Sequence, residues 1–187
     1  MNFGILRIGL AAGALGLLGG CAASIPVSDP NTLATVPVYR MGPGDTVRVS
    51  VFSVPNLSGD FAVSDDGTIS YAMLGPIKAT GLTVEELRQR VAAELAKGYV
   101  NDPQVSAQIV TFRPYYVMGE VSQPGRYALG DNVTALRAIA TAGGLTYRAS
   151  RKYVFLRRDG RDEIKLPLDS DFQVLPGDVL RVGERHL

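Results

Sequence analysis

Hydrophobic and polar residues alternate along several short stretches of the chain. Valine takes every second position of Thr46–Phe52, with Thr, Arg and Ser between, and the same alternation returns over residues 105–109. Such a period of two is typical of strands that bury one face. Asp66-Gly67 is a turn signal and precedes a short apolar stretch, Thr68–Tyr71. We therefore expect three strands in the first half of the chain.

A helical pattern occupies Thr83–Lys97, between the second and third of these strands. Thr83 and Glu86 have the spacing of a capping box, and Gly98 follows the helix where helices commonly end. Apolar residues recur at helical spacing at Val84, Leu87, Val91 and Leu95. The first unit thus has the order strand, strand, helix, strand, which predicts a small α+β domain.

The second half predicts a hairpin, a short helix and another hairpin, the order of a β-grasp unit. A strand over Tyr115–Val121 is followed by a turn at residues 123–126 and a partner strand at Tyr127–Leu129. Asn132 or Thr134 can cap a short helix that Gly143-Gly144 ends. The second hairpin turns at Asp159-Gly160, between Tyr153–Arg157 and Glu163–Leu166.

One internal repeat links the two ends of the chain. Residues 39–49, YRMGPGDTVRV, align without gaps on residues 172–182, FQVLPGDVLRV. Pro-Gly-Asp is a good turn by itself, and that explains each copy separately. The matched flanks lead us to predict that the final segment, residues 171–187, returns as a strand beside the first unit.

The N-terminus has the features of a secretory signal. Residues 8–20 are uncharged, follow Arg7 and are too short for a membrane-spanning helix. We expect a signal peptide at residues 1–20 and a flexible tether, rich in Pro, Ser and Thr, at residues 21–38. Leu18-Gly19-Gly20-Cys21 resembles the bacterial lipobox, which implies cleavage before Cys21 and its lipidation. The alternatives are ordinary cleavage near Ala22-Ala23 and a buried thiol. Ala22 in place of Asp favours, by the same resemblance, the outer membrane.

Composition and charge exclude several classes of function. The chain has a net charge of +1, and Arg7 is the one charged residue of the signal, so the remainder is neutral and nothing favours nucleic acid. With one cysteine, no disulfide framework can form. Glycine-rich residues 42–44 and 143–144 lack the Lys-Ser/Thr of a nucleotide loop. The core must therefore hold by packing, and we expect no cofactor and no metal site.

No group of residues has the pattern of a catalytic centre. His186, the single histidine, lies next to the C-terminus. Asp65-Asp66 and Glu85-Glu86 are carboxylate pairs of the kind that glycosidases use. The first pair precedes a turn glycine and the second opens a helix, where negative charge is favourable. We therefore expect both pairs to be structural and the protein not to be an enzyme.

Aromatic and basic residues of the second unit are the candidates for sugar contact. Tyrosines can stack on sugar rings, although strand aromatics more often pack in a core. Arginines give this unit a basic bias that suits an anionic glycan, a neighbouring subunit or simply a solvated face. The tyrosines are Tyr115, Tyr116, Tyr127 and Tyr147, and the arginines are Arg126, Arg148, Arg151, Arg157 and Arg158.

In order, these motifs resemble the bacterial polysaccharide biosynthesis/export family of outer-membrane lipoproteins. YRMGPGDTVRVSVF and the segment from Asp65 to Ile109 are similar to its export domain, which we place at residues 39–112. The stretch YVMGEVSQPGRYALGDNVTALRAIATAGGLTYRASRKYVFLRRDG resembles the SLBB β-grasp domain, which we place at residues 113–170. The resemblance implies an α+β fold and a role in exporting capsular or extracellular polysaccharide.

The resemblance also implies partners. It predicts a homo-oligomeric periplasmic ring, lipid-anchored to the outer membrane, that carries polysaccharide and docks on an inner-membrane co-polymerase. Five residues follow the last predicted strand, too few to cross a membrane, so we expect a separate outer-membrane β-barrel to supply the pore. The alternative is a lipoprotein that binds glycan or another soluble ligand and exports nothing.

Overall fold

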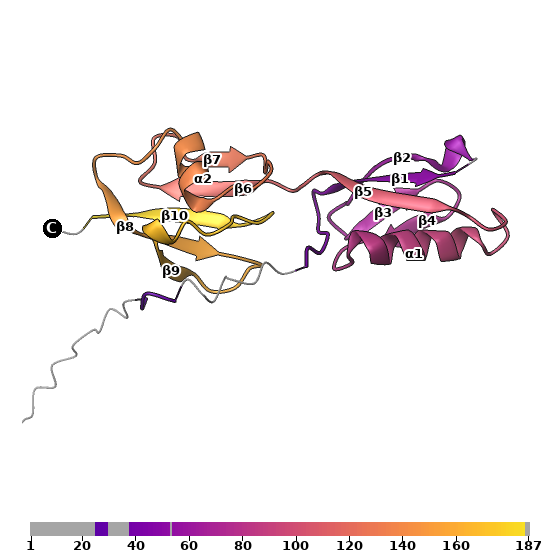
Figure 1. Ribbon diagram of the computed structural model, residues 1–187, viewed down its shortest axis with the longest axis horizontal. Coiled ribbons are helices and arrows are strands. Elements are labelled where there is room, and N and C mark those ends of the chain that lie inside the picture. Colours follow the sequence, from indigo (N-terminus) through magenta and orange to yellow (C-terminus); the bar gives the residue numbers. More distant parts are fainter. Residues whose placement is uncertain (1–24, 30–37, 53, 186–187) are drawn as a thin grey trace, which may run out of the picture.

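The protein folds into two lobes that lie end to end (Figure 1). The computed structural model describes residues 25–29, 38–52 and 54–185. The predicted signal peptide, Cys21 and His186 lie outside these residues. Each lobe has its own sheet, helix and buried apolar cluster, and one short linker at residues 112–114 joins the last strand of the first lobe to the first strand of the second.

The first domain packs one helix against a three-stranded antiparallel sheet. Strand β1 (Thr46–Val51) lies between β2 (Gly59–Ala62) and β5 (Val105–Thr111). Two further strands, β3 (Thr68–Tyr71) and β4 (Gly75–Lys78), form a separate hairpin. A short 3-10 helix, Pro55–Leu57, follows β1, and helix α1 (Val84–Leu95) precedes β5.

The alternating valines of β1 form the centre of this domain. Val47, Val49 and Val51 are buried, while the residues between them are partly or fully exposed. Helix α1 faces them with Leu87, Val91 and Leu95, all completely buried. The predicted capping box is confirmed: Glu86 N donates to Thr83 Oγ1 at 3.1 Å, and Thr83 N donates to Glu86 Oε2 at 2.8 Å. Local capping and apolar spacing thus specify both the start and the buried face of α1.

The second domain is a mixed five-stranded sheet with the order β7-β6-β10-β8-β9. The predicted hairpins are present as β6 with β7 and β8 with β9, but the partner of β6 begins at Gly125, inside the predicted turn, and ends at Tyr127, where the predicted strand began. Thr134, and not Asn132, caps the short helix α2. The elements are β6 (Tyr115–Gly119), β7 (Gly125–Tyr127), α2 (Ala135–Thr141), β8 (Ala149–Arg157), β9 (Ile164–Pro167), a 3-10 helix (Leu168–Ser170) and β10 (Val179–Glu184).

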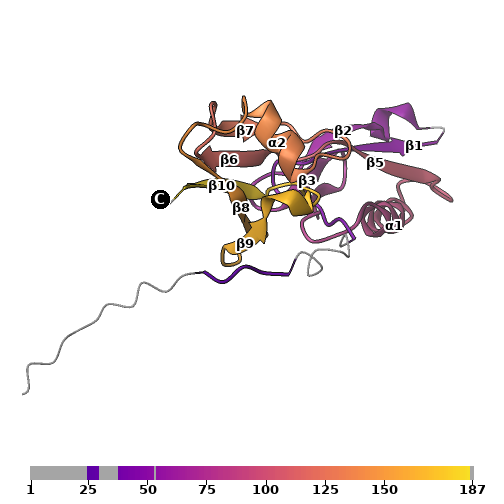
Figure 2. The ribbon, with the colours of Figure 1, turned by 60° about the vertical axis from the view of Figure 1, so that its left-hand side comes forward.

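The predicted return of the last strand to the first unit is wrong. Strand β10 lies in the middle of the second sheet, parallel to β6 and antiparallel to β8, far from β1 (Figures 1 and 2). Its apolar residues Leu180 and Val182 are buried in the second core. Without β10 the two hairpins have no shared strand, so this sheet is the place where β10 satisfies most backbone hydrogen bonds and buries most apolar surface.

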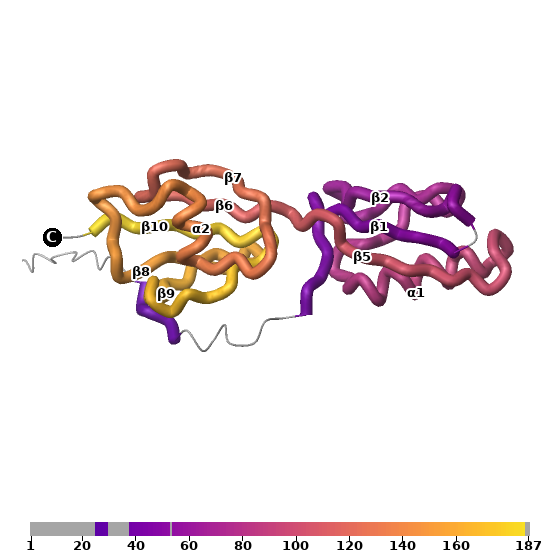
Figure 3. Tube along the Cα trace, turned by 45° about the horizontal axis from the view of Figure 1, so that its top comes forward, coloured from indigo at the N-terminus to yellow at the C-terminus, as the bar shows by residue number. Residues whose placement is uncertain are grey.

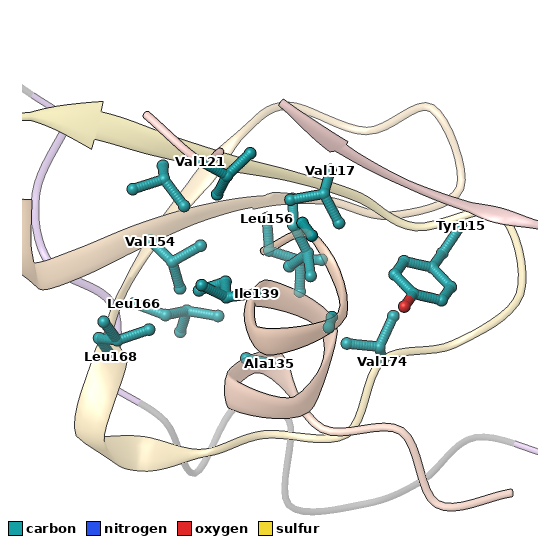
Figure 4. Packing of buried hydrophobic residues seen from close by; sticks show 14 of the residues in the cluster. Tyr115, Val117, Val121, Ala135, Ile139, Val154, Leu156, Leu166, Leu168 and Val174 are labelled. Carbon is teal, nitrogen blue, oxygen red and sulfur yellow. The ribbon is translucent and has the colours of Figure 1, made fainter. Parts of the chain in front are cut away.

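Helix α2 covers one face of the second sheet. Ala135 and Ile139 lie against Val154, Leu156 and other inward-facing strand residues (Figure 4). Of the helices in the described residues, none covers the opposite face. One face of this sheet is therefore core, and the other is available for contacts outside the domain.

The α+β class is confirmed, and the structure adds two strands that the pattern did not predict, β2 and β4. Part of the predicted tether also has a defined position. Ser28 N donates to Lys165 O at 2.8 Å, and Val27 forms a parallel bridge with Lys165, so residues 25–29 run beside β9 (Figure 3). Among the described helices, none has the length and apolar character needed to span a bilayer.

Candidate functional site

The two Pro-Gly-Asp turns have the same hydrogen-bonded structure, and each contains a buried aspartate. Asp45 is 0% exposed, and its Oδ2 accepts hydrogen bonds from Gly42 N at 2.7 Å and from Tyr39 Oη at 2.5 Å. Asp178 is equally buried, and its Oδ2 accepts from Leu175 N at 2.8 Å, the position equivalent to Gly42. In both turns the carboxylate thus closes its own loop just before a strand, which is why the sequence repeats there.

Each buried aspartate also has an arginine partner from another part of the chain. Arg158 donates from Nε to Asp178 Oδ1 at 2.9 Å and from Nη2 to Oδ2 at 2.7 Å, a two-point pair. Arg113 donates its backbone N–H to Asp45 Oδ1 at 2.7 Å, and its guanidinium lies 3.4 Å from Oδ2. Buried charges need such partners, because an unpaired carboxylate inside a protein is costly.

Tyr39 lies beside the Asp45–Arg113 pair, and burial changes the pKa of its hydroxyl. Desolvation, and then its hydrogen bond to Asp45, raise the pKa of the Tyr39 hydroxyl above its ordinary value. The ring also packs edge-on against Phe112, with centroids 5.1 Å apart. Tyr39 is therefore a neutral, fixed donor that holds the start of the first domain to the linker.

Arg113 lies between both turns and belongs to the linker. A Cβ at Gly42 would come within 2.5 Å of Arg113 Nη1, and one at Gly177 within 2.7 Å of Arg113 Nε. Gly177 N also donates to Pro114 O at 3.1 Å. The glycines let the Arg113 side chain pack against a turn of each domain, so the junction is a specific contact between the domains.

A hollow of about 920 Å³ lies at this junction and is lined by both domains. The first domain and linker contribute Tyr39, Arg40 and Phe112, and the second contributes Asn132 and Arg161 among others. Two of its lining arginines, Arg113 and Arg158, form ion pairs with buried aspartates. We therefore assign the junction to domain positioning.

The open face of the second sheet has a different character, because cations and aromatic rings alternate across it. The strand register places Met118, Arg181, Phe155 and Lys165 side by side on neighbouring strands. The Arg181 guanidinium lies 3.9 Å from the Phe155 ring centroid, and Glu163 Oε1 accepts from Arg181 Nε at 2.8 Å. That contact with Arg181 lowers the pKa of the Glu163 carboxyl.

A second groove, of about 810 Å³, lies over this face where β8 begins and β10 ends. Its basic lining residues are Arg151, Lys152, Lys165, Arg181 and Arg185, and its aromatic ones are Tyr147, Tyr153 and Phe155. Lys165 Nζ lies 4.0 Å from the Tyr153 ring centroid. Cations held over aromatic faces are attracted by the ring quadrupole, so Tyr153 and Phe155 position the charges above them.

The four candidate tyrosines divide into two pairs. Tyr115 is buried and its ring stacks on Tyr127, whose hydroxyl donates to Gln123 O. Both therefore belong to the core of the second domain. Tyr116, 42% exposed, lies on the open face, and Tyr147, 81% exposed, lies at the edge of the groove. These two remain available to a sugar.

The candidate arginines divide in the same way. Arg158 is used by Asp178, and Arg148 Nη2 donates to Glu184 Oε1 at 2.6 Å. Arg126 and Arg157 lie on the open face, in register with Tyr116 and Val179, and Arg151 lines the groove. The basic bias noted in the sequence is therefore concentrated on the uncovered side of the sheet.

The carboxylate pairs have structural partners. Asp66 Oδ1 accepts from Ser64 Oγ at 2.7 Å and from Thr68 N at 3.0 Å, which closes the turn before β3. Glu86 completes the cap of α1, and Glu85 accepts from Arg88. Three of the four carboxylates are thus engaged in turn and helix hydrogen bonds. Among the described residues, no cluster of His, Cys, Asp and Glu could hold a metal ion.

Sequence comparison gives these two domains a family. Residues 33–110 match the profile of the polysaccharide biosynthesis/export protein family, and residues 113–182 match that of the SLBB domain. The chain belongs to the polysaccharide export family. The SLBB match extends into β10, as far as residue 182, in agreement with the position of that strand in the second sheet.

Curated relatives of this export-family chain come from several bacteria. It is 32% identical over 172 residues to the exopolysaccharide production protein ExoF of Rhizobium meliloti, covering 86% of this chain and 38% of that protein. It is 28% identical over 190 residues to the EPS I polysaccharide export outer membrane protein EpsA of Ralstonia nicotianae, covering 82% of this chain and 49% of that protein. It is 27% identical over 167 residues to the polysialic acid transport protein KpsD of Escherichia coli, covering 83% of this chain and 30% of that protein. The chain thus spans less than half the length of each of these relatives.

Proposed function

We propose that this protein is a periplasmic, outer-membrane-anchored ring component that conducts a capsular or extracellular polysaccharide across the cell envelope. The observation that carries the proposal is the export domain followed directly by the SLBB domain, over most of the described chain. The names of the relatives, which refer to exopolysaccharide production, EPS I export and polysialic acid transport, support the same role.

The junction supports a ring because a ring needs subunits of fixed shape. Arg113 contacts a turn in each domain, so the two domains keep one relative orientation that every copy shares. Identical rigid subunits can close by repeating one heterologous contact. A junction that bent freely would not favour closure.

Strand edges are a second source of support. Of the described strands, β2, β5 and β7 each pair on one side only and lie at the edge of their sheets. Natural proteins cover or pair such edges, because unpaired N–H and C=O groups invite association. Head-to-tail packing of copies around a ring would cover them and leave a passage for the polymer.

The proposed ring works with membrane partners and performs no bond chemistry. We place the lipid anchor at Cys21, an inner-membrane co-polymerase below the ring, and a separate outer-membrane channel above it. The Asp66, Glu85 and Glu86 carboxylates are engaged in hydrogen bonds within the fold, which favours transport over glycan cleavage.

Gene deletion with complementation tests the proposal. We expect the deletion strain to keep polymer in the periplasm and to lose it from the surface, and the intact gene to restore export. Native mass spectrometry of the gently extracted protein should show a closed homo-oligomer. Normal surface polymer in the deletion strain, together with a monomer under every extraction condition, would contradict the proposal and favour a glycan-binding lipoprotein that exports nothing.

A further inference from the structure

The groove over the open face of the second domain concentrates unpaired positive charge. Within the described part of the chain, Arg151, Lys152 and Arg185 make no ion pair, and Lys165 lies over an aromatic ring. The one carboxylate in the lining, Glu184, is held by Arg148 at 2.6 Å. The whole chain has a net charge of only +1, so this excess is local. A groove with such a field attracts a negatively charged ligand.

The spacing of the charges indicates an extended ligand. The cations come from three adjacent strands, at the start of β8, directly after β10 and within β9, so they are spread across the sheet. A compact anion such as phosphate would contact one or two of them. A chain that carries a negative group at intervals can contact several at once.

Tyr147 adds a preference for sugar. Tyr147 is 81% exposed and lines the groove from the segment between α2 and β8. An exposed aromatic ring next to a charged groove offers an apolar surface to the C–H face of a sugar. The rings of Tyr153 and Phe155 lie beneath Lys165 and Arg181, so Tyr147 is the lining aromatic whose face we assign to stacking.

We propose that this groove is a binding site for an acidic polysaccharide chain, whose carboxylate groups contact Arg151, Lys152 and Arg185 while a sugar ring stacks on Tyr147. The inference rests on the proposed function and adds the charge class of the polymer. Exposed ion pairs each contribute little, so the chain would be held weakly at many points and could slide.

The test measures binding of alginate oligosaccharides, a polyuronate, to the detergent-purified full chain, with neutral dextran as the comparison. We expect alginate to bind and dextran not to bind, with affinity that falls as salt rises. Arg151→Gln with Lys152→Gln should weaken alginate binding by about fivefold or more. Tyr147→Ala should weaken it in low and high salt alike.

Matched variants in the first domain serve as controls. Arg90→Gln with Lys97→Gln removes the same charge from α1 and the turn that follows it, and Tyr99→Ala removes another exposed tyrosine; both should leave alginate binding unchanged. Equal binding of alginate and dextran, or unchanged binding in the Arg151/Lys152 variant, would overturn the inference. So would loss of the oligomer in that variant with alginate binding intact, because the face would then be a contact between copies.

The two proposals fail separately. If deletion of the gene traps polymer but the purified protein does not bind alginate, the ring proposal stands and the acidic-ligand site is wrong. If alginate binds as expected but deletion leaves surface polymer unchanged, the site stands and the export role is wrong.

Discussion

Asp45 and Asp178 are equivalent residues in two copies of one turn, and each accepts a backbone hydrogen bond from the residue three positions earlier. Both side chains are fully buried, and each has an arginine partner. The first copy introduces the central strand of the first sheet and the second introduces the central strand of the second sheet. The repeat therefore marks how each domain begins its middle strand.

The Arg158–Asp178 pair should be important for the stability of the second domain. Arg158→Leu leaves Asp178 buried without its cation, and we expect a loss of about 3 kcal/mol in the free energy of unfolding. Urea denaturation followed by a probe in the second domain measures it. Arg157→Leu is the matched control, because Arg157 precedes Arg158 in the sequence and its side chain is exposed. It should change the free energy of unfolding by about 0.5 kcal/mol or less. A small effect at both positions would show that the pair contributes little.

Arg113→Ala tests the junction between the domains. The change removes the guanidinium that lies against Asp45 and Gly177, so we expect wider variation in the angle between the domains. Because the lobes lie end to end in the native arrangement, bending at the linker brings them closer, and small-angle scattering should show a smaller mean radius of gyration. Arg113→Lys keeps the charge and should restore part of the native distribution. Scattering curves that coincide for all three proteins would mean that the junction does not depend on Arg113.

Gly119 should be intolerant of any side chain. Its φ is +84°, and a Cβ there would lie 2.1 Å from the carbonyl oxygen of Val182 on the adjacent strand β10. Gly119→Ala should therefore destabilise the second domain by about 2 kcal/mol or more through strain and displacement of β10. Thermal unfolding of Gly130→Ala provides the control, since a Cβ at Gly130 meets nothing within 4 Å. Equal melting temperatures for the two variants would contradict the observed approach of β6 to β10.

Glu85 should titrate unusually low. Hydrogen bonds from Arg88, and then from Gln89, lower the pKa of its carboxyl to about 2. Because the unfolded value is about 4.3, the folded form binds this proton less tightly than the unfolded form does. The stabilising contribution is therefore complete above about pH 4.3 and is lost as pH falls toward about 2.

Carboxyl-carbon NMR titration measures the pKa of Glu85 directly. Arg88→Gln should raise it toward its ordinary value, whereas Arg90→Gln, on the same helix without a contact to Glu85, should leave it near 2. A Glu85 pKa of about 4.3 in the unmodified protein would rule out the hydrogen-bonded arrangement in solution.

Cys21→Ser tests the proposed lipid anchor, which lies outside the described residues. We expect the substitution to abolish palmitate labelling and to release the protein from the outer-membrane fraction. Ala22→Ser, one position later, should keep both properties. Palmitate labelling that persists in Cys21→Ser would exclude Cys21 as the lipidated residue.

Strands were predictable where alternation was long or a strong turn signal marked a hairpin, and β2 and β4 were missed. β1 and β5 carry repeated apolar residues, and the α1 cap is a local motif, so neighbouring residues reveal them. β2, Gly59–Ala62, has no fully buried residue, and β4 contains Gly75 and Pro76, which favour turns. Both strands are stabilised by pairing with another strand, and their own residues have no pattern that predicts this pairing.

The sequence predicted which types of residue form the candidate site, but not which of those residues are buried and which line the groove. The sequence indicated basic and aromatic residues in the second half, yet Tyr115 packs in the core and Tyr147 is exposed. The same holds for arginine, since Arg158 pairs with a buried aspartate while Arg151 lines the groove. The repeated Pro-Gly-Asp was the available signal for the buried aspartates, but nothing local indicated that Arg113 and Arg158 would be their partners.

By itself the sequence determined the local elements of this protein: the alternating strands, the capped helix, the two hairpins and the paired turns. These depend on residues a few positions apart, whose spacing and hydrogen bonding act before distant segments meet. Only the tertiary structure decided that β10 joins the second sheet, that Arg113 lies between two turns, and that cations gather on the uncovered face. Those outcomes depend on which distant surfaces bury the most apolar area and satisfy the most backbone groups together, a property of the whole chain.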